Sequence, residues 1–77
     1  MKYHMEAYNN RGTVLRIDAC IASVAERAAR YMLPDAGSAT RKVLADALAE
    51  DIPTQIAASG RAMIRTPAVT VEVRPLH

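Results

Sequence analysis

The sequence has no tryptophan and no phenylalanine, and its only aromatic residues are Tyr3, Tyr8 and Tyr31. Apolar residues still make up 51% of the 77 positions, and alanine is the most frequent of them. This composition is typical of a globular chain rather than a disordered one, and the length fits a single compact domain spanning residues 1–77. A core without large rings gains less stability per residue, so added stability from a dimer or a partner would suit this chain.

Cysteine is nearly absent as well. Cys20 is the single thiol, so it cannot form an internal disulfide, and a reducing cytoplasm is the expected location. The first residues carry Lys2, His4 and Glu6 and lack the apolar core of a signal peptide. No apolar run approaches the roughly 20 residues that a bilayer-spanning helix needs, so we expect no membrane partner.

The residues that would support catalysis or metal binding are scarce. The two histidines, His4 and His77, do not combine with Cys20 into any zinc-ligand spacing. The three glycines are isolated from one another, so there is no phosphate-binding loop. Cys20 is expected to be a small buried thiol, and Ser23 is better explained as a helix cap. The sequence therefore predicts a protein that is not an enzyme and that uses no cofactor and no metal.

The charge is modest and comes mainly from arginine. Ten basic residues against eight acidic ones give a net charge of +2, which is too balanced for a strongly cationic nucleic-acid arm. Two explanations of the arginine content stay open. Abundant Ala and Arg fit a GC-rich bacterial or phage genome, while guanidinium forks are also suited to recognising carboxylates and phosphates.

Two segments near the N-terminus alternate polar and apolar residues with the period of a half-buried strand. They are residues 2–8, KYHMEAY, and residues 13–19, TVLRIDA. A three-residue loop, Asn10-Arg11-Gly12, keeps their apolar faces in register and puts Gly12 at the left-handed position of a common hairpin. The predicted cross-strand pairs are Ala7 with Leu15, Met5 with Ile17, Glu6 with Arg16, and His4 with Asp18.

An amphipathic helix should follow. Ser23-Val24-Ala25-Glu26 has the pattern of a capping box, which predicts that the helix begins at Ser23, and Pro34 should end it. Its predicted buried stripe is Val24, Ala25, Ala28, Tyr31 and Met32, with Glu26, Arg27 and Arg30 outward.

A second helix is predicted to begin at Ser38 or Thr40. Pro53 should stop this helix or open a short extra turn, and the pattern assigns no structure to residues 51–60. The predicted buried stripe is Val43, Leu44, Ala47, Leu48 and Ile52, and the predicted solvated residues are Arg41, Lys42, Asp46 and Glu50.

The C-terminal segment is predicted to be extended. Residues 69–74, VTVEVR, alternate like a strand, and residues 61–66 could be its hairpin partner across a loop of residues 65–68. That loop would pair Ile64 with Val69 and Arg61 with Glu72. The element order is then β-β-α-α-β-β, and the expected fold is α+β: a four-stranded antiparallel sheet with two helices packed on one face.

The other face of this sheet is expected to be open, with Tyr8, Val14 and Met63 as its apolar centre, and it is the one candidate site. Its proposed binding residues are Tyr8, Arg16, Arg61, Met63, Arg65 and Arg74. Arginine and aromatic side chains on a sheet can anchor a protein interface or bind nucleic acid. The alternative is a solvated face on which the Glu6–Arg16 and Arg61–Glu72 pairs only hold neighbouring strands together.

The stretch KYHMEAYNNRGTVLRIDACIASVAERAARYM, a short hairpin running into an Ala-rich helix, carries a resemblance. In size and layout it resembles the small phage- or plasmid-encoded α+β proteins that include anti-CRISPR inhibitors. The resemblance covers less than half of the chain and contains no specific motif, so it assigns no site residue. It implies stoichiometric binding to a larger host protein or nucleoprotein complex, without turnover. A small nucleic-acid-binding regulator and a homodimeric structural subunit are the alternatives.

Overall fold

The structure is a computed structural model, and it describes residues 1–76. The chain forms two strands, two helices and two further strands, which confirms the predicted order and the α+β class. The elements are β1 (Tyr3–Asn9), β2 (Gly12–Ala19), α1 (Ile21–Met32), α2 (Ser38–Ser59), β3 (Ala62–Arg65) and β4 (Thr70–Pro75).

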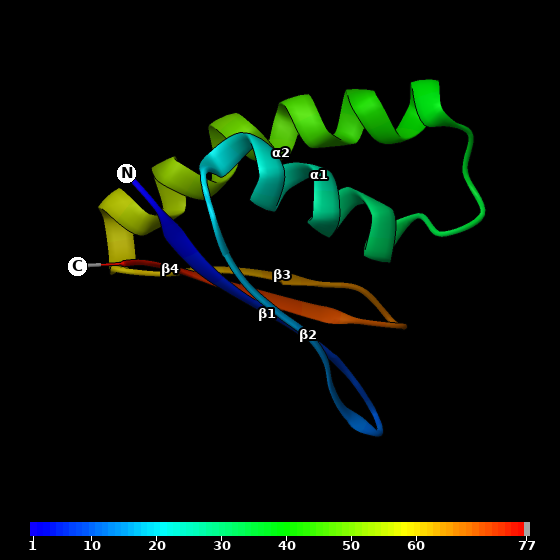
Figure 1. The fold of residues 1–77 in the computed structure, drawn as a ribbon, viewed down its shortest axis with the longest axis horizontal. Helices are drawn as coiled ribbons and strands as arrows, with labels where there is room; N and C mark the ends of the chain where they lie inside the picture. The colour runs from blue at the N-terminus through cyan, green and yellow to red at the C-terminus, as the bar shows by residue number, and fades with distance from the viewer. Residues whose placement is uncertain (77) are drawn as a thin grey trace.

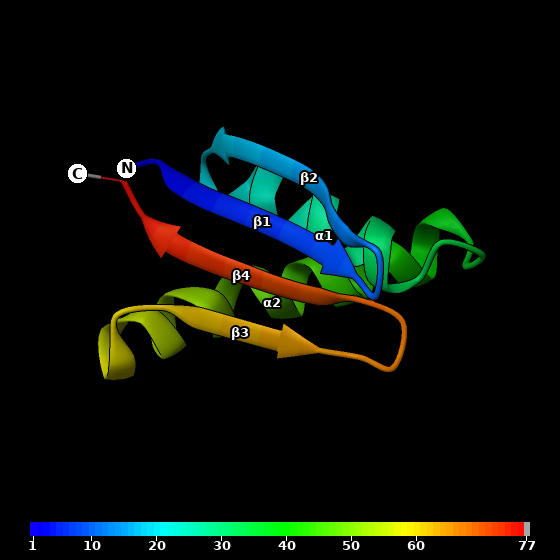
Figure 2. The ribbon, with the colours of Figure 1, turned by 90° about the horizontal axis from the view of Figure 1, so that it is seen from below.

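The four strands form one antiparallel sheet in the order β2-β1-β4-β3 (Figure 2). The first and last strands therefore lie side by side in its centre, and the two hairpins flank them. The backbone N–H of Leu76 donates to the carbonyl of Lys2 at 2.9 Å, which extends the β1–β4 pairing by one step. The central pair joins residues far apart in the sequence, so neither hairpin alone can form this sheet.

Both helices lie on the same side of the sheet, and no element covers the other side within residues 1–76 (Figure 1). The core lies between these two layers. Alternate residues of the strands meet the inward stripes of α1 and α2, and none of the core residues has an aromatic ring. The buried residues are Met5, Ala7, Val24, Ala25, Ala28, Ala29, Leu48, Ile52, Ala62, Val69, Val71 and Val73.

The register of the first hairpin is the predicted one, but the turn is built differently. All four predicted pairs occur in the β1–β2 ladder. The loop, however, is the two residues Asn10 and Arg11, since Asn9 already pairs with Gly12. The extra residue lies at Val14, where a β-bulge separates the Tyr8–Thr13 pair from the rest of the ladder. The predicted three-residue loop is therefore wrong.

Helix α1 begins at Ile21, two residues before the predicted start. Cys20 is the N-cap in extended conformation, and its carbonyl accepts the first helical hydrogen bond, from Val24 N–H at 3.0 Å. Ser23 thus lies inside the first turn and cannot be the cap of a capping box. The early start lets Ile21 pack against the core directly after β2 ends. Three residues of the predicted stripe, Val24, Ala25 and Ala28, are buried, and Met32 packs on the core, but Ala29 is buried as well and Tyr31 is only half-buried. The stop before Pro34 is confirmed.

Helix α2 begins at Ser38 and continues through Pro53 to Ser59, so the predicted stop at Pro53 is wrong. Proline in a helix interior loses one backbone hydrogen bond and typically costs about 3 kcal/mol. Burial of Ile52, which has no exposed surface, and packing of Ile56 on the core offset that cost. Gly60 then ends the helix in left-handed conformation, with φ of 87°.

The buried stripe of α2 is rotated by about one residue relative to the prediction. Leu44, Leu48 and Ile52 face the core, as expected, but Val43 is 71% exposed and Ala47 is also exposed. The row at i, i+4 spacing along this side continues instead to Ile56.

The second hairpin is paired two residues away from the predicted register. Ile64 pairs with Val71 and Met63 with Glu72, not Ile64 with Val69. The turn is Thr66-Pro67-Ala68-Val69, closed by Thr66 N–H donating to the Val69 carbonyl at 2.9 Å. A shift of two residues preserves the face of every side chain, so the predicted inner and outer sets survive the error.

Candidate interaction face

The six predicted binding residues lie on the sheet surface that faces away from the helices, here called the outer face. Cross-strand pairs fix their positions: Tyr8 and Arg65 flank Thr70 in one row, and Met63 lies next to Glu72 in another. Arg61 directly precedes β3. The cross-strand pairs place these residues on the outer face: His4, Glu6, Tyr8, Thr13, Arg16, Asp18, Met63, Arg65, Thr70, Glu72 and Arg74. Arg61 joins them through its contact with Glu72.

A line of alternating charges crosses the outer face. Arg16 Nε donates to Glu6 Oε1 at 2.9 Å, and Arg61 Nη1 donates to Glu72 Oε2 at 3.0 Å, so both expected pairs form. Arg74 joins these two pairs, because its guanidinium lies 3.6 Å from Glu6 Oε2 and 3.8 Å from Glu72 Oε1. The result is a network in the order Arg16–Glu6–Arg74–Glu72–Arg61, which crosses β2, β1 and β4 and ends at the residue before β3.

The carboxylates of this network lie beneath the guanidinium groups. The side chains of Glu6 and Glu72 are only 19% and 15% exposed, whereas that of Arg74 is 52% exposed. The hydrogen bond from Arg16 is the main cause that lowers the pKa of Glu6 below its ordinary value. Glu6 is therefore ionised at neutral pH, and it contacts Arg16 and Arg74 while more than half of each arginine side chain remains exposed.

One end of the network includes His4. Its Nδ1 lies 2.6 Å from Asp18 Oδ1, as the predicted register requires, and its Nε2 lies 3.5 Å from Glu6 Oε2. Both ring nitrogens of His4 therefore face carboxylate oxygens. This arrangement ties β2 to β1 at the edge of the sheet.

The opposite end of the outer face differs in character. Arg65 is exposed and makes no ion pair with any residue of the described part of the chain. Its neighbours across the rows, Tyr8 and Met63, are half-buried. At this corner of the outer face, the guanidinium of Arg65, which has no ion-pair partner in residues 1–76, lies near the large side chains of Tyr8 and Met63.

Val14 does not belong to the outer face, contrary to the expectation. The β-bulge at this residue breaks the alternation, and Val14 lines a groove together with Arg27 and Tyr31 of α1. Strict alternation from the flanking residues had placed it beside Tyr8. The bulge turns Val14 away from the outer face, and the sequence of the turn contains no signal that predicts this bulge.

Cys20 is exposed, so its expected burial is wrong. Its Sγ lies 3.6 Å from Ser23 Oγ, and the backbone amide and then the hydroxyl of Ser23 lower the pKa of the thiol from its ordinary value. Within residues 1–76, no three His, Cys, Asp or Glu side chains come together as a metal site would require. His77 lies outside the described residues.

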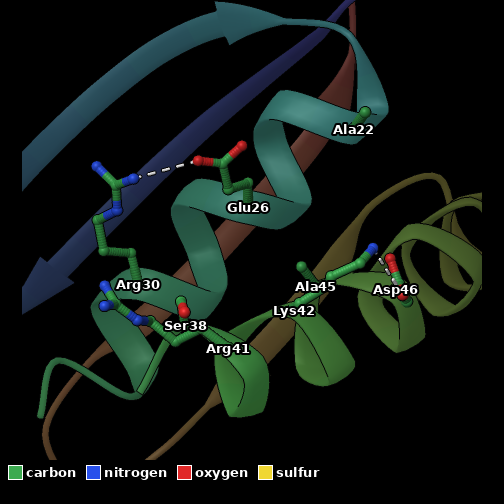
Figure 3. Close-up of a pocket in the computed structure, with 8 residues that line it drawn as sticks. All are labelled: Ala22, Glu26, Arg30, Ser38, Arg41, Lys42, Ala45 and Asp46. Carbon is green, nitrogen blue, oxygen red and sulfur yellow. Dashed lines mark hydrogen bonds and ion pairs between the residues drawn. The ribbon is translucent and has the colours of Figure 1, made fainter. Parts of the chain in front are cut away.

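A polar groove of about 390 Å³ runs between the two helices, on the opposite side of the molecule from the outer face. Figure 3 shows one ion pair on each helix, Glu26–Arg30 on α1 at 3.2 Å and Lys42–Asp46 on α2 at 3.4 Å. Arg41 lies between them half-buried, and its Nε is shielded from water without a hydrogen-bond partner among the described residues. The expectation that Arg41 is solvated is wrong, because the rotation of α2 turns this residue toward α1.

Comparison of the chain with protein-family models, curated proteins and solved structures gave no match. No helix in residues 1–76 combines the length and apolar character needed to span a bilayer. The argument for a function therefore depends on the surfaces described above.

Proposed function

We propose that this chain is a non-enzymatic interaction protein whose outer face binds stoichiometrically to a larger protein or nucleoprotein complex. The observation that carries the proposal is the uncovered sheet face, on which four arginines lie together with Tyr8 and Met63. A two-layer fold of this size has no third layer to bury that face. Its lone exposed thiol suits a reducing compartment, so the cytoplasm is the proposed location.

The charges of the outer face favour a protein partner over nucleic acid. Four arginines are accompanied there by three carboxylates, those of Glu6, Asp18 and Glu72. Phosphate groups that approached Arg16, Arg61 or Arg74 would compete with carboxylates already in contact with them. Within residues 1–76 the only rings on this face are those of Tyr8 and His4, and His4 already contacts Asp18, whereas single-stranded nucleic acid is usually held by several stacking rings.

Protein interfaces, in contrast, are enriched in tyrosine, methionine and arginine. The carboxylates beneath the arginines restrict their rotamers before a partner arrives, and this lowers the entropy lost on binding. Each guanidinium has five N–H donors, so one that contacts Glu6 or Glu72 retains donors for an acidic or carbonyl-rich surface.

The resemblance to small phage-encoded proteins supplies a specific form of this proposal. An inhibitor of the anti-CRISPR type would act by occupying the surface of a host complex, and a rigid face of mixed charge is suited to that role. We propose this class of partner on the resemblance of the N-terminal region alone.

The proposal is tested by affinity capture from a lysate of the source cells, with and without nuclease. The test variant combines Tyr8→Ala with Arg65→Glu, because Arg65 lies outside the ion-pair network and its reversal leaves Glu6 and Glu72 paired. The control combines Lys42→Glu with Val43→Ala on exposed parts of α2, and it changes the net charge by the same amount.

We expect one defined protein or complex to be recovered with the unmodified chain and the control, but not with the test variant, and to survive nuclease. Recovery that disappears with nuclease would favour the nucleic-acid alternative, for which affinity should fall steeply with salt. Equal recovery by all three proteins would contradict the assignment of the outer face. Light scattering over a dilution series would separately show whether the chain forms a homodimer.

A further inference from the structure

A second groove, of about 430 Å³, lies at the end of the molecule where the turns of both hairpins meet the C-terminal half of α1. The bulge residue Val14 and the turn residue Val69 contribute to it from the sheet. Tyr31 and Pro34 contribute from α1 and the loop that follows it. None of these residues belongs to the outer face as defined above, so this groove is separate from the proposed interaction face.

The bulge gives the groove an apolar surface that is not packed into the core. Val14 is 43% exposed although it lies in a strand, and Tyr31 is only half-buried. Bulges often redirect a side chain next to a functional site. Here the bulge brings a valine to an opening instead of pairing it on the outer face, where strict alternation would have placed it.

The charged residues of the groove are all of one sign. Arg27 and Arg30 line it, and no Asp or Glu side chain does. Arg30 contacts Glu26 at 3.2 Å, but Arg27 makes no ion pair with any of residues 1–76. The polar groove between the helices is different, because its cations alternate with Glu26 and Asp46.

We infer that this groove binds a small ligand with an apolar body and a single carboxylate. The apolar body would contact Val14, Tyr31 and Val69, and the guanidinium of Arg27 would receive the carboxylate in a two-pronged hydrogen bond. A concave site that is mainly apolar, with one or two oriented polar groups, is typical of small-molecule recognition, and the volume lies within the usual range. Arg30 is already paired with Glu26, so Arg27 is the one lining cation without an ion-pair partner in residues 1–76, and a single carboxylate suits the groove better than a multiply charged phosphate.

The test uses phenylbutyrate as the probe and its uncharged amide, phenylbutyramide, as the matched control. Titration of each into the full chain is followed by the amide chemical shifts. We expect phenylbutyrate to shift the signals of Val14, Tyr31 and Val69, and to bind about tenfold more tightly than the amide, since a hydrogen bond to a charged group is the stronger kind.

Two variants test the residues. Arg27→Gln should reduce the affinity for phenylbutyrate to about that of the amide, and Val14→Asp should weaken binding of the carboxylate by at least as much, through charge repulsion. Lys42→Gln, which removes a cation outside the groove, should leave the affinity unchanged. Unchanged spectra away from the groove would show that each variant remains folded.

Three results would overturn the inference. One is equal affinity for phenylbutyrate and phenylbutyramide. The second is a set of shifts that maps to the outer face or to the polar groove between the helices. The third is the absence of any shift with either compound. The outcome is independent of the outer face, so it neither supports nor contradicts the proposed protein partner.

Discussion

At the scale of single residues, Glu6 is the centre of the outer-face network. Its carboxylate contacts Arg16 and Arg74 and lies 3.5 Å from His4. Three strands are joined through this one side chain, because Arg16 lies in β2 and Arg74 in β4. Exposed ion pairs between neighbouring residues of one helix, such as Lys42–Asp46, typically contribute little to stability.

We therefore expect Glu6→Gln to lower the urea midpoint of unfolding at neutral pH more than Asp46→Asn does. The pKa of Glu6 is lowered from its ordinary value in the folded state, mainly by the hydrogen bond from Arg16, so its stabilisation is present above the ordinary pKa and is lost as the pH falls through the lowered pKa. The free energy of unfolding should consequently fall less steeply with acid in Glu6→Gln than in the unmodified chain. Parallel pH profiles would contradict this role, as would equal midpoints for the two variants.

At the scale of elements, Gly12 determines the first turn. Its φ of 117° is a conformation that residues with a side chain rarely adopt, although a Cβ there would meet no atom within 4 Å. Gly37, the N-cap of α2, also has open space around it but has an ordinary φ of −68°. Neither position is crowded, so a difference between alanine substitutions at Gly12 and Gly37 would report the backbone strain at Gly12.

Gly12→Ala should lower the free energy of unfolding by about 1–2 kcal/mol. Gly37→Ala should change it by less than about 0.5 kcal/mol, since a poorer cap and a less flexible unfolded chain offset each other. Urea denaturation of both variants provides the measurement. Equal effects at the two positions would show that the turn is not under the inferred constraint.

A second prediction at this scale concerns Pro53 in the interior of α2. We infer that α2 forms despite this proline and does not need it for stability. Pro53→Ala restores an N–H donor for the Ala49 carbonyl, and part of the gain is offset by lost contacts of the half-buried ring. We expect the free energy of unfolding to rise by about 1–2 kcal/mol. Ala47→Pro, at an exposed position of the same helix, should lower it by about 3 kcal/mol. Destabilisation by Pro53→Ala would mean that the ring is essential to the packing of α2.

The elements also show what the sequence could and could not predict. The first hairpin was predictable to the residue pair, because apolar and charged partners both match in one register only. The second hairpin has only one acidic residue, Glu72, so charge matching constrains its register less. A slip of two residues also leaves every face unchanged, and its register was therefore predicted wrongly. The end of α2 was missed because tertiary burial of Ile52 and Ile56 outweighs the local effect of Pro53. In an Ala-rich helix the apolar stripe is broad, and this explains the error at Val43 and Arg41.

The candidate site likewise has features that the sequence could predict and features that it could not. Alternation along each strand placed all six predicted residues on the outer face, and it also predicted two of the ion pairs. The link through Arg74 could not be predicted, because the pairing of β1 with β4 joins the two ends of the chain and leaves no local pattern. The groove at Val14 was missed for a similar reason, since a bulge breaks the alternation on which the prediction relied.

At the scale of the whole molecule, the decisive property is that the sheet is covered on one side only. The molecule measures 33 × 28 × 19 Å, and its two layers bury a core of aliphatic side chains and alanines. The ion-pair network joins three of the four arginines of the outer face to Glu6 and Glu72 without burying the face. The face is thereby organised and still accessible, as a surface for a macromolecular partner needs to be.

The most direct test of this account is site-specific photo-crosslinking in nuclease-treated lysate of the source cells. A photoreactive amino acid is placed either at position 65 of the outer face or at position 43, an exposed position of α2. We predict a single adduct of defined mass from position 65 and none from position 43, with both proteins folded as judged by circular dichroism. An adduct from position 43 alone, or no adduct from position 65, would contradict the claim that the outer face is the binding surface.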